Sequence, residues 1–228
     1  TVVHTQTIHF TQKGNRENQA GTVIAFDGNP SNYISIPASG SDYLLEETEG
    51  FTLECWVRVL QGAAMPQTII SKKASNEVTS PGWLLQLQNN GQFAFLVSDG
   101  VNQDELATST YFANQEWYHL AIIYKPTAGT AIDIYVNGVA HRVSFDKTAG
   151  NINNTEPIEI GKSNFQGELD EIRIWNTAKN QDAIRENMHV LTNICQPDLI
   201  SSWQFNETGN LALDLVGGYD GTIMGEVS

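Results

Sequence analysis

The chain has 228 residues, of which 40% are hydrophobic and 17% charged, a composition that supports a sizeable core and argues against intrinsic disorder. Its 26 acidic residues exceed its 12 basic residues, for a formal net charge of −14. This balance argues against nucleic acid and anionic membranes as partners, and no apolar run approaches the roughly 18 residues of a membrane-spanning helix.

The length suits one large β-domain better than two small ones. Residues 1–21 are polar, with alternation only over residues 5–11, and we expect an edge strand or the remnant of a linker there. Residues 22–228 are then one domain. The chain opens with Thr1-Val2-Val3, without an initiator Met or the apolar stretch of a signal peptide, so we expect a mature form or one piece of a larger polypeptide.

Short strand-like stretches separated by turn signals follow along the chain, and helical periodicity is almost absent. The expected strands cover residues 23–26, 33–37, 51–59, 68–71, 83–88, 92–97, 116–124, 131–136, 139–145, 199–205 and 221–224. Asn-Gly at positions 90–91 and 137–138 predicts two hairpins, because both residue types accept the positive φ of a type I′ turn.

One short helix is expected after Asn180, which can cap it, with Ala183, Ile184 and Met188 on one face. We expect this helix to plug one end of the domain. Many antiparallel strands without repeats or low-complexity linkers predict an all-β fold, an antiparallel two-sheet β-sandwich with one short helix.

The two cysteines leave two alternatives open. Alternation places Cys55 on an apolar strand face with Leu53 and Val57, where a small buried thiol is an adequate explanation. A disulfide between Cys55 and Cys195, closing a long loop, is the other.

Several motifs occur in an order that resembles one family. They are Phe51-Thr52-Leu53-Glu54-Cys55-Trp56-Val57, Trp117-Tyr118-His119-Leu120-Ala121, Ile134-Tyr135-Val136-Asn137-Gly138, the stretch from Phe165 to Asn176, and Trp203-Gln204-Phe205. This order is similar to the laminin-G-like (LamGL) jelly roll of the concanavalin A-like lectins and glucanases, over residues 22–225. The resemblance implies a jelly roll, but little about the ligand, because this fold carries lectins, adhesion modules and glycoside-cleaving enzymes.

The resemblance also implies a structural Ca²⁺, held by Asp170 together with Asp27 and a carbonyl near Gly28. The apolar positions change phase between Leu169 and Ile172, which predicts a β-bulge that turns Asp170 out of the ladder. Ca²⁺ takes six to eight oxygen ligands, and these groups with water supply that chemistry. The alternative is that Asp27 forms an Asx-turn and Asp170 bonds a neighbouring loop.

Catalysis is not expected. The related glucanases carry Glu-x-Asp-x-x-Glu on one strand, and residues 168–173 here place Arg173 in the third acidic position. A guanidinium does not donate a proton at working pH. The histidines show no zinc-binding spacing, and no Gly-x-Ser-x-Gly nucleophile motif occurs.

An acidic surface is compatible with divalent cations and with neutral ligands such as sugars, although it also serves solubility alone. Sugar sites combine aromatic faces with polar groups that bond hydroxyls. Trp56 lies on the strand face opposite Cys55 and is a candidate for an exposed concave surface, whereas core packing is the main alternative for the other strand tryptophans. Loop candidates for the ligand site are Asn102, Gln103, Asp104 and Tyr111.

We therefore expect a non-catalytic, lectin-like module that binds a glycan or cell-surface ligand, within a larger extracellular protein. A protein–protein adhesion or structural module without sugar affinity is the alternative, and a glycoside-cleaving enzyme the less favoured one.

Overall fold

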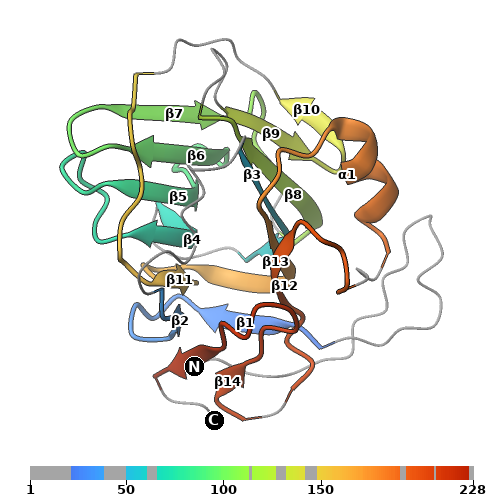
Figure 1. The fold of residues 1–228 in the computed structure, drawn as a ribbon. Helices are drawn as coiled ribbons and strands as arrows, with labels where there is room; N and C mark the ends of the chain where they lie inside the picture. Colours follow the sequence, from blue (N-terminus) through green and yellow to red (C-terminus); the bar gives the residue numbers. More distant parts are fainter. Residues whose placement is uncertain are drawn as a thin grey trace.

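The computed structural model describes residues 22–38, 50–60, 66–112, 115–126, 132–141, 148–190, 194–207 and 209–225, and residues 1–21 lie outside these ranges. The described residues form two antiparallel sheets and one helix, the β-sandwich that the strand pattern predicts (Figure 1). Within them, no helix combines the length and apolar character needed to cross a membrane.

The first sheet has seven strands, and its central strand β12 (Gln166–Trp175) has β3 on one edge. Along the other edge, β1 pairs with residues 166–169 and β13 with residues 172–175. The remaining strands are, in chain order, β1 (Ile24–Asp27), β3 (Phe51–Val59), β8 (Trp117–Tyr124), β9 (Ile132–Val136), β10 (Val139–His141) and β13 (Leu199–Trp203).

The second sheet has eight strands, in the order β14-β15-β2-β11-β4-β5-β6-β7. Their bounds are β2 (Tyr33–Ile36), β4 (Gln67–Lys73), β5 (Gly82–Leu87), β6 (Phe93–Ser98), β7 (Gln103–Ala107), β11 (Ile158–Ile160), β14 (Leu211–Ala212) and β15 (Gly221–Met224). The main core lies between the sheets and is filled by alternate residues of the facing strands.

Local features follow the sequence closely. Asn137 and Gly138 both have positive φ, at 49° and 71°, in the turn between β9 and β10, as the Asn-Gly signal predicts. The β12–β3 register shifts between Asp170 and Arg173, and Glu171 has a φ of 50°, which confirms the predicted bulge.

Cys55 and Cys195 are not joined by a disulfide, so the disulfide alternative is wrong. Cys55 is fully buried between the sheets, and burial raises the pKa of its thiol. Cys195 is exposed. The small buried thiol, rather than a crosslink, explains the apolar surroundings of Cys55.

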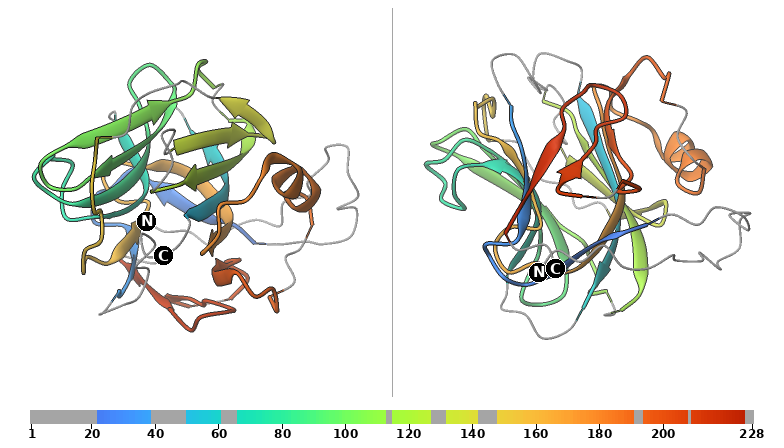
Figure 2. Two further views of the ribbon diagram at one scale, coloured as in Figure 1. Left: turned by 45° about the horizontal axis from the view of Figure 1, so that its top comes forward. Right: turned by 90° about the horizontal axis from the view of Figure 1, so that it is seen from below.

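Helix α1 (Gln181–Asn187) begins as predicted, with the Asn180 side chain accepting from the Ala183 amide. Its predicted place at one end of the sandwich is wrong. Ile184 packs with Ala121, Ile123 and Tyr135, so α1 covers the outer face of β8 and β9 (Figure 2). The reason is that β8 is apolar on both faces, and its outer face requires a cover of its own.

Candidate functional site

Helix α1 and the residues that follow it cover the outer face of the first sheet. Trp56 is only 7% exposed, and its indole Nε1 donates to the Met188 carbonyl at 3.1 Å. Its ring also packs against those of His119 and His189. The expectation that Trp56 belongs to an open concave surface is therefore wrong, because the residues after α1 lie over it.

Beneath this cover lies a buried ion cluster. Arg173 is 1% exposed and lies 2.7 Å from Glu171 Oε2 and 3.7 Å from Glu54 Oε2. His119 faces the same Glu54 oxygen at 3.4 Å. Burial alone would raise the pKa of Glu54, but His119 and Arg173 hold the pKa of this carboxyl below its ordinary value.

The predicted calcium ligands do not come together. Asp27 pairs with Gln166, whereas Asp170 lies four residues farther along the same strand, which corresponds to about 13 Å at 3.3 Å per residue. Asp27 accepts from the Asn29 amide at 2.9 Å and from the Asn32 side chain at 3.2 Å, the Asx-turn of the alternative. Gly28 follows with a φ of 84°.

Asp170 is buried, and its Oδ1 accepts from the Glu171 amide at 2.8 Å. Within the described ranges, no three His, Cys, Asp or Glu side chains gather as a metal ion would need. The geometry does not fit a Ca²⁺ site shared by Asp27 and Asp170. Ca²⁺ binding itself stays a prediction, without these two residues as joint ligands.

We expect Asp27→Asn to leave any effect of Ca²⁺ on the melting temperature unchanged, because Asn keeps the acceptor of the Asx-turn and Asp170 lies out of reach. Thermal unfolding of both proteins in EDTA and in added Ca²⁺ measures this. A Ca²⁺-dependent rise that disappears in Asp27→Asn alone would instead place an ion at this turn.

The predicted loop candidates separate into two places. Asn102 and Gln103 are exposed at the β6–β7 turn. Asp104 is not open to a ligand, because it shares the inward side of β7 with Leu106 and accepts from the Thr148 and Ala149 amides. Tyr111 is 77% exposed and lies beside the turn at the other end of β6, where the Phe112 amide bonds the Gly91 carbonyl.

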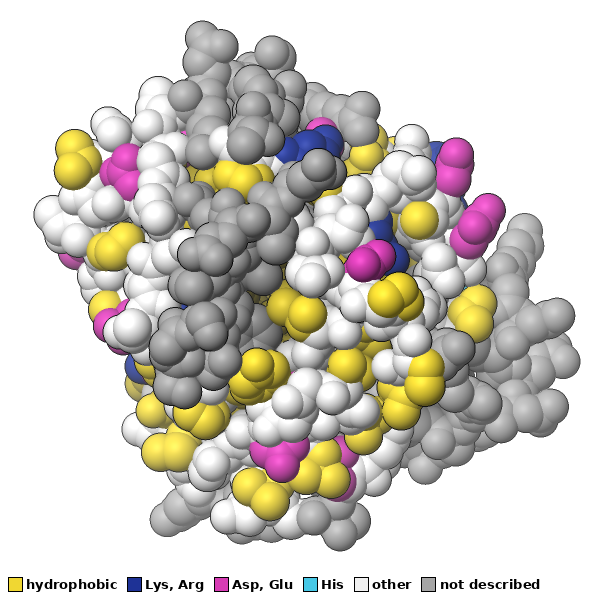
Figure 3. Space-filling view, in the orientation of Figure 1, with side chains coloured by type: hydrophobic (Ala, Val, Ile, Leu, Met, Phe, Trp, Pro, Cys, Tyr) yellow, Lys and Arg dark blue, Asp and Glu magenta, His cyan; other side chains and the backbone are white. Residues whose placement is uncertain are grey.

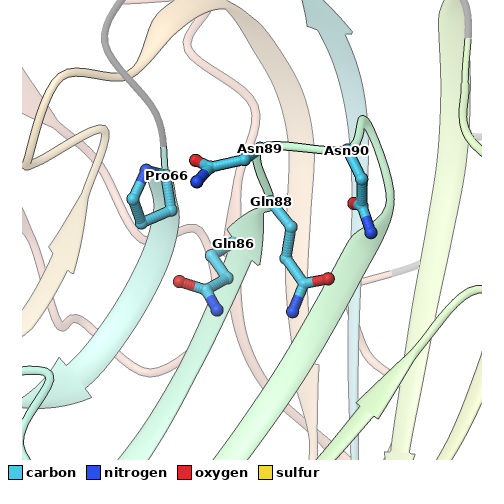
Figure 4. Close-up of a pocket in the computed structure, with 5 residues that line it drawn as sticks. All are labelled: Pro66, Gln86, Gln88, Asn89 and Asn90. Carbon is cyan, nitrogen blue, oxygen red and sulfur yellow. The ribbon is translucent and has the colours of Figure 1, made fainter.

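That turn carries a cavity that is open to solvent. Four carboxamide side chains and one proline line a cavity of about 330 Å³, where the β5–β6 turn meets the beginning of β4 (Figure 4). We call it the amide pocket, and its residues are Pro66, Gln86, Gln88, Asn89 and Asn90.

The four amides differ in how they are held. Gln88 donates to Glu105 Oε1, and Asn90 accepts from the Gln92 amide at 3.1 Å, so both are fixed from outside the pocket. Gln86 is 8% exposed and points away from the main core, since it pairs with Thr68 and Ala94. Neither its carboxamide nor that of Asn89 makes a hydrogen bond to another of the described residues.

Sequence reasoning missed this pocket. The run from Gln86 to Gln92 holds five amide side chains around one Gly, and the prediction used it only as a hairpin turn. Alternation along β5 already points Gln86 to the outer face, so the amide-rich turn was the available signal. On the face shown in Figure 3, charged side chains of the described residues are scattered rather than gathered, and no dense acidic or basic patch competes as a site.

Comparison with known proteins decides the family. The family described as the concanavalin A-like lectin/glucanases superfamily matches residues 27–185. The chain belongs to this superfamily. No curated protein sequence matches it.

Solved structures confirm the fold of this superfamily member. A putative carbohydrate binding protein from Bacteroides ovatus superposes with a TM-score of 0.67 at 20% identity, over 85% of this chain and 56% of that one. The binding domain of Paraclostridial Mosquitocidal Protein 1 gives 0.59 at 19%, over 72% and 42%. A Ruminococcus gnavus IT-sialidase CBM40 bound to α2,3-sialyllactose gives 0.55 at 10%, over 72% and 95%. The chain thus spans about half the length of the first two.

The two glutamate carboxylates in the stretch of β12 that resembles the glucanase motif are engaged in ion pairs. Glu168 lies 2.6 Å from the Arg58 Nε, and Glu171 is paired with Arg173. Arg173 also donates to the Val190 carbonyl at 3.3 Å, beneath the segment that follows α1. Arg173, which stands where the glucanase motif has its third acidic residue, therefore helps to hold the segment after α1 against the sheet.

Proposed function

We propose that the domain is a non-catalytic carbohydrate-binding module that holds one sugar unit in the amide pocket. The observation that carries this proposal is Gln86, a largely buried residue in the cavity wall whose carboxamide has no hydrogen-bond partner among the described residues. Its donors and acceptor are open to solvent in the cavity and are available to a ligand. A sugar offers several hydroxyls at once.

The size and chemistry of the pocket support a small polar ligand. Its volume of about 330 Å³ falls at the lower end of the roughly 300–1,000 Å³ of ligand sites. Each carboxamide supplies one acceptor oxygen and two N–H donors, which match hydroxyl groups that both donate and accept. Tyr111, exposed next to Gly91 in the same turn, offers an aromatic face on which a sugar ring can pack.

The neighbours named above include a putative carbohydrate binding protein and a sugar-bound CBM40, which is in keeping with the proposal. We further propose that the domain acts outside the cell as one part of a larger protein. Detection of the parent polypeptide in the medium or at the cell surface, by fractionation with an antibody to this domain, tests the location.

The decisive test is binding by matched variants. A glycan array followed by calorimetry on the strongest probe should give a discrete, saturable sugar ligand for the wild type. Gln86→Leu keeps most of the side-chain volume but removes every hydrogen bond, so we expect the affinity to fall about tenfold or more. Asn89→Ala and Tyr111→Ala should weaken binding in the same direction.

Asn210→Ala is the matched control, because Asn210 is an exposed amide beside β14, on the far edge of the same sheet. It should bind like the wild type. Equal affinity of Gln86→Leu and wild type would place the sugar elsewhere. A blank array would instead favour protein–protein adhesion.

A specific observation supports that second function. Large hydrophobic side chains are exposed around β14 and β15, namely Leu211, Leu213, Leu215 and Met224. Exposed apolar groups that lie close together on a surface often mark protein contacts. Purified domain that captures no glycan, yet binds a protein partner in a manner weakened by Leu211→Ser and Leu215→Ser, would establish adhesion as the function.

A further inference from the structure

Among the residues that the structure describes, no charged side chain lines the amide pocket. The five described lining residues are a proline, two glutamines and two asparagines, none of which titrates. Among the described residues, the ionisable group that hydrogen-bonds a lining side chain is Glu105, whose Oε1 accepts from Gln88 Nε2. The local charge beside the pocket is therefore negative, in a chain whose net charge is −14.

The lysines that the structure describes on the neighbouring strands are engaged or distant, and Lys73 lies with Gly82 at the end of β4 away from Pro66. Lys162 pairs with Glu159 and lies 4.9 Å from the centre of the Tyr33 ring. Lys72 donates to the carbonyl and the side chain of Asn154. Lys72 is also six residues from Pro66, which is about 20 Å in an extended strand. None of these lysines is a lining residue of the pocket.

This arrangement discriminates between classes of sugar. A hydroxyl group is neutral and matches a carboxamide as both donor and acceptor. The carboxylate of a sialic or uronic acid loses its hydration on burial and is ordinarily bound by Arg, Lys or several converging N–H groups. In the amide pocket it would find no cation and would lie near the Glu105 carboxylate.

We infer that the pocket selects neutral sugar units and rejects acidic ones. The inference rests on the proposed function and names the ligand class of the same site. It separates this chain from the CBM40 neighbour, which is bound to α2,3-sialyllactose and shares only 10% identity with it. Gln86 and Asn89, whose side chains bond no other described residue, bond the hydroxyls, and the absence of a cation among the described lining residues sets the preference.

The test uses matched pairs of oligosaccharides, each printed once as the neutral form and once with a terminal sialic or uronic acid. Lactose and α2,3-sialyllactose are one such pair. The wild-type chain should bind the neutral members at least about tenfold more tightly than their acidic partners. Raising the NaCl concentration should leave the neutral affinity unchanged, since no ion pair forms.

A variant with a gained charge completes the test. Asn89→Arg should raise the affinity for acidic partners about tenfold or more, and this gain should disappear in high salt. Asn210→Arg adds the same charge at the far edge of the sheet and should give no such gain.

The outcomes separate the two claims. Acidic sugars bound as tightly as neutral ones, or an equal gain from Asn89→Arg and Asn210→Arg, would overturn the selectivity and leave sugar binding intact. A blank array for every pair would overturn the proposed function and the selectivity together.

Discussion

Replacing Arg173 with Met is expected to lower the free energy of unfolding by about 3–5 kcal/mol. Its guanidinium is buried between the Glu54 and Glu171 carboxylates, and it also donates to the Val190 carbonyl. Without the guanidinium, the carboxylates of Glu54 and Glu171 remain buried, and their negative charges repel each other. Urea unfolding followed by fluorescence measures the loss, since Trp56 and Trp175 lie in this region.

The matched control removes the stranded charges as well. Arg173→Met combined with Glu54→Gln and Glu171→Gln should recover more than half of the lost stability, because the buried network is then neutral. Sugar binding should persist in every variant that remains folded, since the amide pocket lies on the other sheet. A loss below about 1 kcal/mol in Arg173→Met would show that water or rearrangement relieves both acids, and would contradict this account.

The fold was predictable because its signals are local. The Asn137–Gly138 turn needs only residues that accept positive φ, and the phase change between Leu169 and Ile172 indicates a bulge without knowledge of any partner strand. The Asn180 cap likewise depends on a bond to the Ala183 amide, three residues away. Each of these features is decided within a few residues.

The sites were less predictable because they depend on the register between strands and on which segments lie over the outer face of a sheet. Asp27 and Asp170 lie on neighbouring strands, but the β1–β12 register separates them by four residues. Trp56 does alternate away from Cys55, yet alternation says nothing about what lies over the outer face. The amide pocket forms only when the start of β4 lies beside the β5–β6 turn, a contact between residues 66 and 86–90.

The sequence predicted that Asp104 binds a ligand, but in the structure its carboxylate bonds another segment of the fold. Its two oxygens accept from the Thr148 amide at 3.0 Å, the Thr148 hydroxyl at 2.6 Å and the Ala149 amide at 2.8 Å. The segment that begins there contributes Ala149 and Ile152 to the main core. Asp104 therefore ties the segment that leads into β11 to the strand β7 that it crosses.

We expect Asp104→Ala to cost about 1–3 kcal/mol of unfolding free energy, because it removes two bonds to Thr148 and leaves the buried Ala149 amide without an acceptor. Gln103→Ala, at the exposed neighbouring position, should change stability by less than about 0.5 kcal/mol. Urea unfolding compares the two, and calorimetry with the neutral sugar at a temperature where both are folded compares their binding. Asp104 lies at the end of β7 away from the amide pocket, so its loss should weaken the fold but not the sugar affinity. Reduced affinity with unchanged stability would reverse that assignment and return the ligand site to the β6–β7 turn.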